Sequence, residues 1–299
     1  MGQDVSRSPL PTVDGVAPSR QTLPAGRWQT VLDFLSERHA AVGADTWAAR
    51  MREGRVVDEA GQRITPESPY RAGACVYYYR EPEAERRVPF AERVLYLDEH
   101  LLVADKPHFL AVAPAGRFLR ETLLVRLKRE TRLDTLVPVH RIDRETAGLV
   151  VFSVNPSTRG AYASLFQRRE IAKVYEALSE SRPAHAFPVT RRSRIVAGEP
   201  FFRMKEVVGE PNSETRVDLS ETRVDLSLYE ARPLTGRKHQ VRLHLAALGL
   251  PILNDRLYPS VLPEAPEDFS SPLKLLARSV SFRDPLTGRE RYFESERKL

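Results

Sequence analysis

Short apolar runs separated by polar turns dominate residues 93–299 of this 299-residue chain. Arg93–Leu97 and residues 101–104 lie on either side of a polar turn and predict two adjacent strands. The near-continuous apolar run 148–152 predicts a strand that is covered on both faces. Because the few helical segments do not alternate regularly with the strands, the sequence predicts an α+β fold rather than a parallel β–α–β fold.

Three helices are expected between these strands. Residues 121–130 place three leucines on one face, and residues 239–248 are followed by a glycine that ends a helix. Asn155 predicts the N-cap of a third helix, with Pro156 at its first position. Another hairpin is expected around the turn 284–288.

The heptapeptide Ser-Glu-Thr-Arg-Val-Asp-Leu occurs twice in succession, at 213–219 and 220–226. A strand alternates faces every two residues, so a repeat of odd length would turn the apolar side chains of the second copy to the opposite face. The repeat therefore predicts a turn or bulge near Ser220 and Glu221. We assign it no chemistry.

Composition divides the chain into four parts. Residues 1–26 are rich in Pro, Ser and Gly and predict a flexible tail. Residues 27–81 combine two short helices, the second capped by Asp45, with a few strands, and predict a small module. The segment 82–92, rich in Glu and Arg, is expected to link this module to a main domain at 93–299.

The chain has 46 Lys and Arg against 40 Asp and Glu, a formal net charge of +6. A net positive charge favours polyanionic partners such as nucleic acid without specifying a sequence. The single cysteine, Cys75, excludes both an intramolecular disulfide and a Cys-based zinc site. No apolar run approaches the roughly 20 residues of a membrane helix, and the N-terminus has no secretory apolar stretch. We therefore expect a cytoplasmic protein without a membrane partner.

The densest group of functional residue types is the segment 140–146, which directly precedes the buried run at 148–152. Asp143 lies between Arg141 and Arg144, and nearby positive charge keeps a carboxylate ionised. An ionised aspartate at the mouth of a buried strand can act as a nucleophile. The alternative is a surface turn with a network of salt bridges, which charged turns commonly form.

A second group spans residues 235–242. Gly236 suits a tight turn, and the donors after it open a helix whose N-terminus favours anions, so phosphate contact and a solvated amphipathic face are both possible. Tyr175 is a weaker signal, because strand tyrosines usually pack in a core. The sequence lacks a P-loop, a Gly-rich dinucleotide fingerprint, HExxH and GxSxG. A mechanism without metal or cofactor is therefore expected.

Four segments resemble signatures of the RluA-type RNA pseudouridine synthases, in the order in which that family carries them. Residues 140–149, HRIDRETAGL, are similar to the family's HRLDRxTSGLLL signature. Residues 98–107 resemble its DEHLLVVDKP strand pair, and residues 173–178 resemble its KxYxAL strand. Residues 235–253 are similar to its TGRTHQIRVHLAALGHPI segment. The matches extend over roughly residues 93–295.

This resemblance implies an α+β catalytic domain with a long, curved, mostly antiparallel sheet, flanking helices and a central cleft. It implies that Asp143 is the nucleophile, that Tyr175 stacks on the target base and assists proton transfer, and that Arg242 pairs with Asp143. Arg141 would fill the gap left by a flipped-out uridine. Whether Asp143 attacks the pyrimidine ring or the ribose stays open. Further RNA contacts are implied for His140, Arg144, Arg237 and Lys238.

The implied substrate is structured RNA, either large-subunit ribosomal RNA or transfer RNA, and the implied enzyme needs no cofactor. Nothing in the sequence demands more than a monomer. Ala147 stands where the family usually has Ser, and Asn254-Asp255 replaces its usual Gly-Asp. Residues 28–80 loosely resemble a small RNA-binding module that precedes many catalytic domains of this family. Its basic face would consist of Arg50, Arg52, Arg55 and Arg63.

Two other functions are compatible with parts of this pattern. One is an RNA-binding or ribosome-assembly factor that keeps the cleft but has little activity, although a pure binder needs no nucleophile. The other is a hydrolase that uses an aspartate nucleophile on small molecules. Such a hydrolase would be active without RNA and would depend little on salt.

Overall fold

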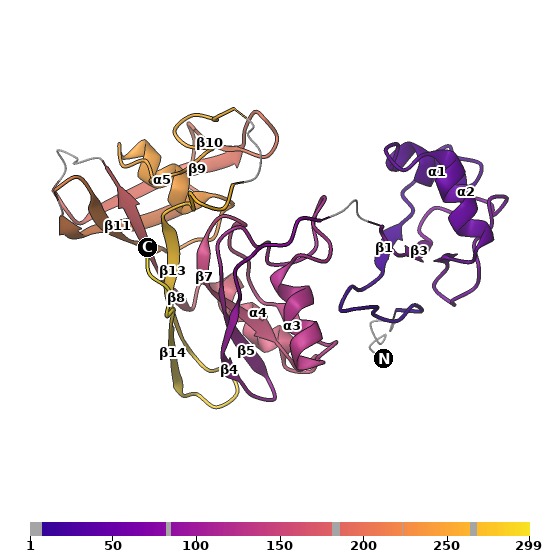
Figure 1. Cartoon of the computed structure of the whole chain (residues 1–299), viewed down its shortest axis with the longest axis horizontal. Coiled ribbons are helices and arrows are strands. Elements are labelled where there is room, and N and C mark those ends of the chain that lie inside the picture. The colour runs from indigo at the N-terminus through magenta and orange to yellow at the C-terminus, as the bar shows by residue number, and fades with distance from the viewer. Residues whose placement is uncertain (1–7, 82–84, 181–185, 223, 264–267) are drawn as a thin grey trace. The chain divides into compact units, whose positions relative to one another are not determined.

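The computed structural model describes residues 8–81, 85–180, 186–222, 224–263 and 268–299. The chain divides into two compact units, Met1–Glu85 and Arg86–Leu299 (Figure 1). The boundary between them falls within the segment that the sequence predicts to be a linker. Within the described ranges, no helix has the length and apolar character needed to cross a membrane.

The N-terminal unit packs two helices on a three-stranded sheet in the order β1–β3–β2. Its elements are β1 (Ser19–Thr22), α1 (Val31–Arg38), α2 (Ala44–Arg52), β2 (Val56–Val57) and β3 (Cys75–Tyr78). Thr30 and Asp33 form a reciprocal capping box that starts α1. Phe34 of α1 and Trp47 of α2 are both buried in a core that includes Val76 of the central strand.

Two predictions for this unit are wrong. Ser19–Thr22, inside the predicted flexible tail, pairs antiparallel with β3. The next residue, Leu23, is buried in the core, and this burial holds the segment on the sheet. The N-cap of α2 is Gly43 rather than Asp45, which lies in the first turn. A carboxylate there still stabilises the helix through its dipole. Residues 82–84 of the predicted linker lie outside the described residues.

The second unit is built on an eleven-stranded sheet with the order β10–β9–β11–β12–β8–β13–β7–β5–β4, in which β14 also pairs with β13 and β6 with β7. Its strands are β4 (Arg93–Leu97), β5 (Leu101–Lys106), β6 (Val137–Pro138), β7 (Ala147–Ser153), β8 (Ile171–Ser179), β9 (Val189–Ala197), β10 (Met204–Val207), β11 (Ser213–Thr222), β12 (Ser227–Pro233), β13 (Leu275–Arg283) and β14 (Glu290–Glu294). Its helices are α3 (Leu123–Thr131), α4 (Arg159–Arg168) and α5 (Gln240–Ala247). The pairs are antiparallel except that β13 runs parallel to β7. The predicted α+β class with a long, mostly antiparallel sheet is confirmed.

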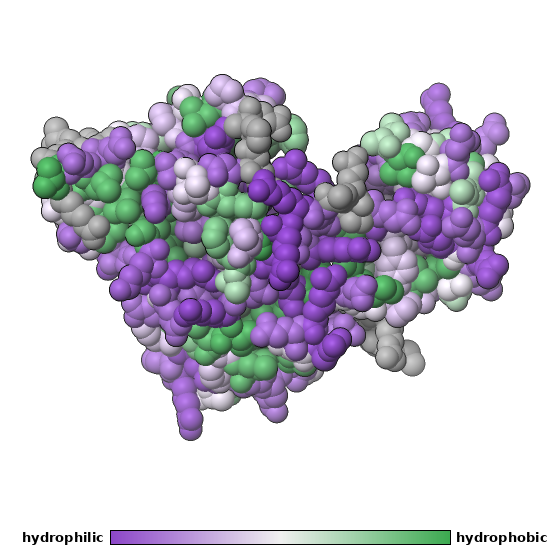
Figure 2. Space-filling view, viewed as in Figure 1, coloured by the Kyte–Doolittle hydropathy of each residue, from purple (hydrophilic) through white to green (hydrophobic). Residues whose placement is uncertain are grey.

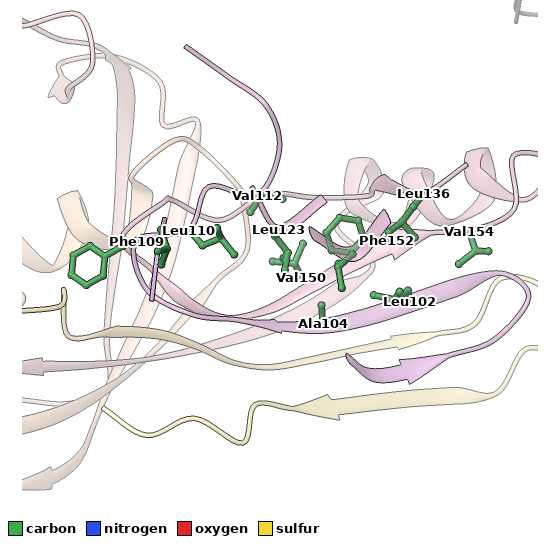
Figure 3. Close-up of a cluster of buried hydrophobic side chains, with 12 residues drawn as sticks. Leu102, Ala104, Phe109, Leu110, Val112, Leu123, Leu136, Val150, Phe152 and Val154 are labelled. Carbon is green, nitrogen blue, oxygen red and sulfur yellow. The ribbon is translucent and has the colours of Figure 1, made fainter. Parts of the chain in front are cut away.

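Strands β5 and β7 are covered on both faces, as the apolar run at 148–152 predicts. Leu102 and Phe152 point to one face, where they join Leu123 of α3 in a buried cluster (Figure 3). On the other face, Leu101 and Val151 pack with a second cluster that includes Leu165 of α4. Successive strand side chains alternate between faces, so an apolar residue at every position is stable only between two cores.

Gly148 is required where β7 meets β13. Its φ is +109°, and a Cβ built there would lie 2.3 Å from the carbonyl oxygen of Ala277. These two residues are paired in the parallel register of β7 and β13. Any side chain would therefore push the two strands apart. The close approach fixes the start of β7, and with it the end of the segment 140–146.

The sequence repeat and the C-terminal hairpin are found as predicted, whereas one helix cap is not. The register of β11 against β12 shifts between Leu219 and Glu221, which confirms the expected bulge. Strands β13 and β14 form the expected hairpin. Helix α4 begins after Thr158, not after Asn155. The side chain of Asn155 instead accepts a hydrogen bond from the backbone N–H of Ser157, at 3.0 Å, and closes a turn before the helix.

Candidate active site

Asp143 lies on the loop between β6 and β7, and its side chain is 23% exposed. Lys106, the last residue of β5, is fully buried and holds this loop in place. The Lys106 ammonium donates to the carbonyl oxygens of Pro107, Leu110 and Arg144, at 2.9, 2.8 and 3.0 Å. Burial lowers the pKa of Lys106 to about 7, against the opposing attraction of nearby carboxylates. The backbone beside Asp143 is thus tied directly to the core of the sheet.

Arg242 of α5 joins Asp143 to a second carboxylate. Its Nη1 donates to Oδ2 of Asp143 at 3.2 Å. Its Nε and Nη2 donate to the two oxygens of Asp255, at 2.8 and 2.7 Å. The Arg242 side chain is 2% exposed and that of Asp255 1%. Burial alone would lower the pKa of Arg242, but the hydrogen bonds to Asp255 and the charge of Asp143 outweigh it, so the pKa is raised and the guanidinium stays charged.

Two more residues complete this group, which we call the Asp143 cluster. Nε2 of His239 lies 3.8 Å from Oδ1 of Asp143. Nδ1 of His239 lies 3.0 Å from the hydroxyl of Tyr258. The guanidinium of Arg242 is also 5.5 Å from the centre of the Tyr258 ring, which favours a buried cation. The Asp143 cluster comprises Asp143, His239, Arg242, Asp255 and Tyr258.

The register of the sheet places Tyr175 near the Asp143 cluster. On β8 it pairs with Ala277 of β13, and Ala277 in turn pairs with Gly148 at the start of β7. The half-buried Tyr175 ring packs against the cluster that contains Val241 of α5. Burial, and secondarily the negative charge of Asp143, raise the pKa of Tyr175. Its phenol is therefore protonated at neutral pH and lies within the electrostatic influence of Asp143.

A separate buried network fixes the start of α5; we call it the His244 cluster. Gln240 accepts from the hydroxyl of Thr235 at 2.6 Å and donates to the hydroxyl of Thr215 at 2.9 Å. His244 is fully buried and lies within 3.0 and 3.1 Å of the hydroxyls of Ser193 and Ser213. Burial lowers the pKa of His244 to about 4, so the ring is neutral. The His244 cluster comprises Ser193, Ser213, Thr215, Thr235, Gln240 and His244.

The predicted RNA-contact residues differ in their surroundings. Arg141, Arg237 and Lys238 are exposed, although Nε of Arg237 donates to the carbonyl oxygen of Asn212 at 3.2 Å. Arg144 forms an ion pair with Glu145 at 3.1 Å and also lies over an aromatic ring. Hydrophilic residues gather over the visible face of this unit, with smaller apolar patches between them (Figure 2).

His140 has a structural position rather than the RNA-contact position expected for it. Its Nε2 accepts a hydrogen bond from the backbone N–H of Val151 at 3.1 Å. Its ring stacks on Phe166, with the ring centres 4.6 Å apart. Burial lowers the pKa of His140 to about 3, so the ring is neutral. The family resemblance made His140 a candidate for RNA contact, but its ring lies against Phe166 and Val151.

Sequence reasoning gave no role to four residues that the structure places at the site: Lys106, His239, Asp255 and Tyr258. Lys106 lies in a segment that carried the family resemblance, and Asp255 was noted only because the residue before it departs from the family. A charged residue inside an apolar strand, as at Lys106, is the signal that could have identified it. Tyr258 has no comparable signal, because its contact depends on how the chain folds back after α5.

Known proteins resemble this chain in sequence and in fold. The model of the RNA pseudouridylate synthase family matches residues 100–247. An uncharacterized RNA pseudouridine synthase of Synechocystis is 31% identical over 242 residues, which cover 76% of this chain and 79% of that protein. The dual-specificity RNA pseudouridine synthase RluA of Pasteurella multocida is 30% identical over 215 residues, which cover 65% of this chain and 88% of that protein.

The matched region covers a smaller share of some longer relatives. Human pseudouridylate synthase RPUSD2 is 34% identical over 176 residues, which cover 56% of this chain and 31% of that protein. Among solved structures, human RNA pseudouridylate synthase domain containing 1 shares the fold, with a TM-score of 0.58 at 22% identity. That alignment covers 72% of this chain and 86% of the human one.

The fold and the four matched segments define an enzyme that modifies RNA. The chain belongs to the RNA pseudouridine synthase family, of the RluA type. The members of this family are isomerases that convert uridine in RNA to pseudouridine.

Proposed function

We propose that this chain isomerises specific uridines in structured RNA, with Asp143 as the nucleophile and the target nucleotide flipped out of its stack. The observation that carries the proposal is the ion pair between a partly exposed Asp143 and a buried Arg242. A buried guanidinium is poorly screened by water, so its attraction to the Asp143 carboxylate is strong. The same ion pair holds one oxygen of Asp143 in place.

The proposed reaction needs no oxidant, reductant or added atom. The carboxylate of Asp143 attacks either the pyrimidine ring or the anomeric carbon of the ribose. The bond between C1′ and N1 breaks, the uracil rotates, and a bond between C1′ and C5 forms. C5 then loses its proton and N1 ends with one, so the product is an isomer of the substrate. Asp143 leaves as the free carboxylate.

Tyr175 suits the role of a base-stacking residue. Its ring belongs to a strand in the middle of the sheet, and a rigid aromatic ring stacks on a flipped base at little cost in conformational entropy. Because its pKa is raised, the phenol keeps its proton at neutral pH and can donate it or a hydrogen bond near Asp143. This supports an assisting role in proton transfer.

Base flipping costs a few kcal/mol, which RNA contacts must offset. Arg141 is exposed two residues before Asp143 and can occupy the space that the flipped uridine leaves. Arg237 and Lys238 are exposed just before α5, and Arg144 lies next to Asp143, so all three can contact phosphates. We leave His140 out of this group, because its ring is committed to Val151 and Phe166.

The substrate that we propose is ribosomal or transfer RNA. Among the relatives, a yeast protein, 30% identical over 197 residues, is described as a tRNA pseudouridine(31) synthase, and the Pasteurella relative is described as having dual specificity. Unstacked bases in loops and bulges are the least costly to flip, which favours such sites in structured RNA. We further propose that residues 93–299 form the catalytic domain, that residues 27–81 bind RNA, and that the protein acts as a cytoplasmic monomer.

The experiment that tests the proposal is pseudouridine mapping on total RNA from cells with and without this protein. Complementation with wild type and with Asp143→Ala runs in parallel. We expect a small set of sites to disappear with the protein and to return only with wild type. Sites that return equally with Asp143→Ala would contradict the proposed nucleophile. An unchanged map, with no activity of the purified protein on ribosomal and transfer RNA, would contradict the proposed function.

A further inference from the structure

His239 is a member of the Asp143 cluster to which the proposed chemistry gives no role. It precedes α5 with a φ of +55°, in the left-handed region that favours glycine. Its side chain is nevertheless only 8% exposed and lies between Tyr258 and Asp143. A glycine would adopt this backbone at lower cost, so the presence of histidine calls for a contribution from the side chain.

A chain of hydrogen bonds leads from the sheet to this imidazole. The hydroxyl oxygen of Tyr258 accepts from the backbone N–H of Met204 in β10, at 2.8 Å. The Tyr258 proton then has two acceptors, Nδ1 of His239 at 3.0 Å and the carbonyl oxygen of Met204 at 3.3 Å. The choice between them decides which nitrogen of His239 carries a proton.

The charges around the ring decide the tautomer. Asp143 and Asp255 are the anions that act on His239, and Arg242 and Lys238 are the cations. Burial, which Asp143 offsets only in part, lowers the pKa of His239, so the ring is neutral at pH 7 and carries one N–H. If Nδ1 held the proton, the lone pair of Nε2 would face the carboxylate of Asp143. If Tyr258 donates to Nδ1, the Nε2–H dipole points at that carboxylate instead, which is electrostatically favourable.

We infer that His239, held in its Nε2–H form by Tyr258, is a positioning residue for Asp143. Arg242 donates a single N–H to Oδ2, which by itself leaves the carboxylate free to turn about its Cβ–Cγ bond. A second donor at Oδ1 fixes the plane of the carboxylate. The present separation of 3.8 Å exceeds a hydrogen bond, and such contacts commonly shorten when substrate binds. The inference rests on the proposed role of Asp143.

The kinetic test compares two substitutions of His239, with an RNA that the wild-type protein modifies as substrate. His239→Gln retains an N–H near the position of Nε2, whereas His239→Leu has the bulk but no donor. We expect His239→Leu to lower kcat by about 10- to 100-fold with KM within about twofold, because misplacement of a reacting group acts on the chemical step. His239→Gln is expected to recover most of kcat. His100→Leu, the same substitution in the turn between β4 and β5, serves as the control.

Other results would contradict the positioning role of His239. If His239→Leu keeps kcat within about twofold of wild type, or if His239→Gln is as defective as His239→Leu, the positioning role is wrong. A loss of kcat that parallels a loss of thermal stability in both variants would assign His239 a structural role only.

A second measurement needs no RNA and so separates this inference from the proposed function. ¹⁵N NMR of the imidazole in the full-length protein at pH 7 is expected to show the proton on Nε2 and none on Nδ1. In Tyr258→Phe, which removes the hydroxyl that fixes the ring, we expect the Nδ1–H form to appear. A proton on Nδ1 in the wild-type protein would overturn the inference even if the enzyme is active.

Discussion

Helix α5 contributes to two polar clusters, the His244 cluster and the Asp143 cluster, which differ in the charge of their groups. The His244 cluster combines hydroxyls and an amide with a neutral histidine, and the carboxylate of Glu206 lies 3.8 Å from Nε2 of His244 without a hydrogen bond to it. In the Asp143 cluster, charged groups lead outward from buried Asp255 through Arg242 to the partly exposed Asp143. A buried network of neutral groups stabilises a fold, whereas a network of charged groups that ends at a partly exposed carboxylate can act on a substrate.

The His244 cluster also shows why a pair of residue types is weak evidence for chemistry. A serine hydroxyl lies 3.0 Å from Nε2 of His244, a distance that suits a nucleophile and its general base. The histidine is fully buried, however, and Ser193 is also buried. No substrate can reach such a pair. We therefore assign the His244 cluster to holding the first turn of α5, which carries Arg242, against β9 and β11.

Removal of the buried cation is the change expected to have the largest effect. Arg242→Ala leaves Asp143 without its ion pair and Asp255 as a buried charge without a counter-ion. We predict that kcat, measured on an RNA that wild type modifies, falls by about 10²- to 10³-fold. The affinity for the same RNA should fall by less than about fivefold. Single-turnover kinetics and direct binding measurements on the same RNA separate the two. A large loss of affinity with unchanged kcat would reverse the assigned role.

The corresponding change in the His244 cluster is expected to act on stability instead. His244→Leu removes the hydrogen bonds between the ring and the buried hydroxyls of Ser193, Ser213 and Thr215, each of which keeps another partner. We predict a decrease of about 1–3 kcal/mol in the free energy of unfolding, measured by urea titration. The kcat of the folded fraction should stay within about twofold of wild type. If His244→Leu abolishes turnover without a loss of stability, the distinction between the two clusters is wrong.

The lowered pKa of Lys106 predicts that the stability of the fold rises with pH above 7. The ordinary pKa of lysine is 10.5, and in the folded protein burial lowers it to about 7. Between these values the unfolded chain binds more protons than the folded one, so this group makes stability rise as pH increases from 7 towards 10.5. Urea titrations at pH 7 and pH 9 should show a smaller rise for Lys106→Met than for wild type. An equal rise in both proteins would contradict a lowered pKa for Lys106.

Much of the fold was predictable because its signals are local. The apolar run at 148–152 requires a strand buried on both faces, and β7 is such a strand. The odd length of the repeat requires a register change, which the structure has between Leu219 and Glu221. Helix caps were less predictable. Gly43 and Thr158 precede the two helices in place of Asp45 and Asn155, because the neighbouring chain decides where each helix can begin.

The candidate site was predictable only in part. The residues that carry family signatures, Asp143, Tyr175 and Arg242, converge in the structure. Their neighbours Asp255 and Tyr258 reach the site through the loop after α5, and no spacing in the sequence encodes that contact. His140 illustrates the opposite error. It is three residues from Asp143 in the sequence, yet its ring stacks on Phe166 and accepts from the backbone N–H of Val151.

The most direct test of the account is single-turnover pseudouridine formation by Asp143→Asn on an RNA that wild type modifies. Asparagine preserves the shape of the side chain and removes its charge, so the RNA-binding surface stays intact. The account predicts no pseudouridine above the level without enzyme, with RNA affinity within about threefold of wild type. Full turnover by Asp143→Asn would contradict the central claim that the carboxylate held by Arg242 performs the reaction.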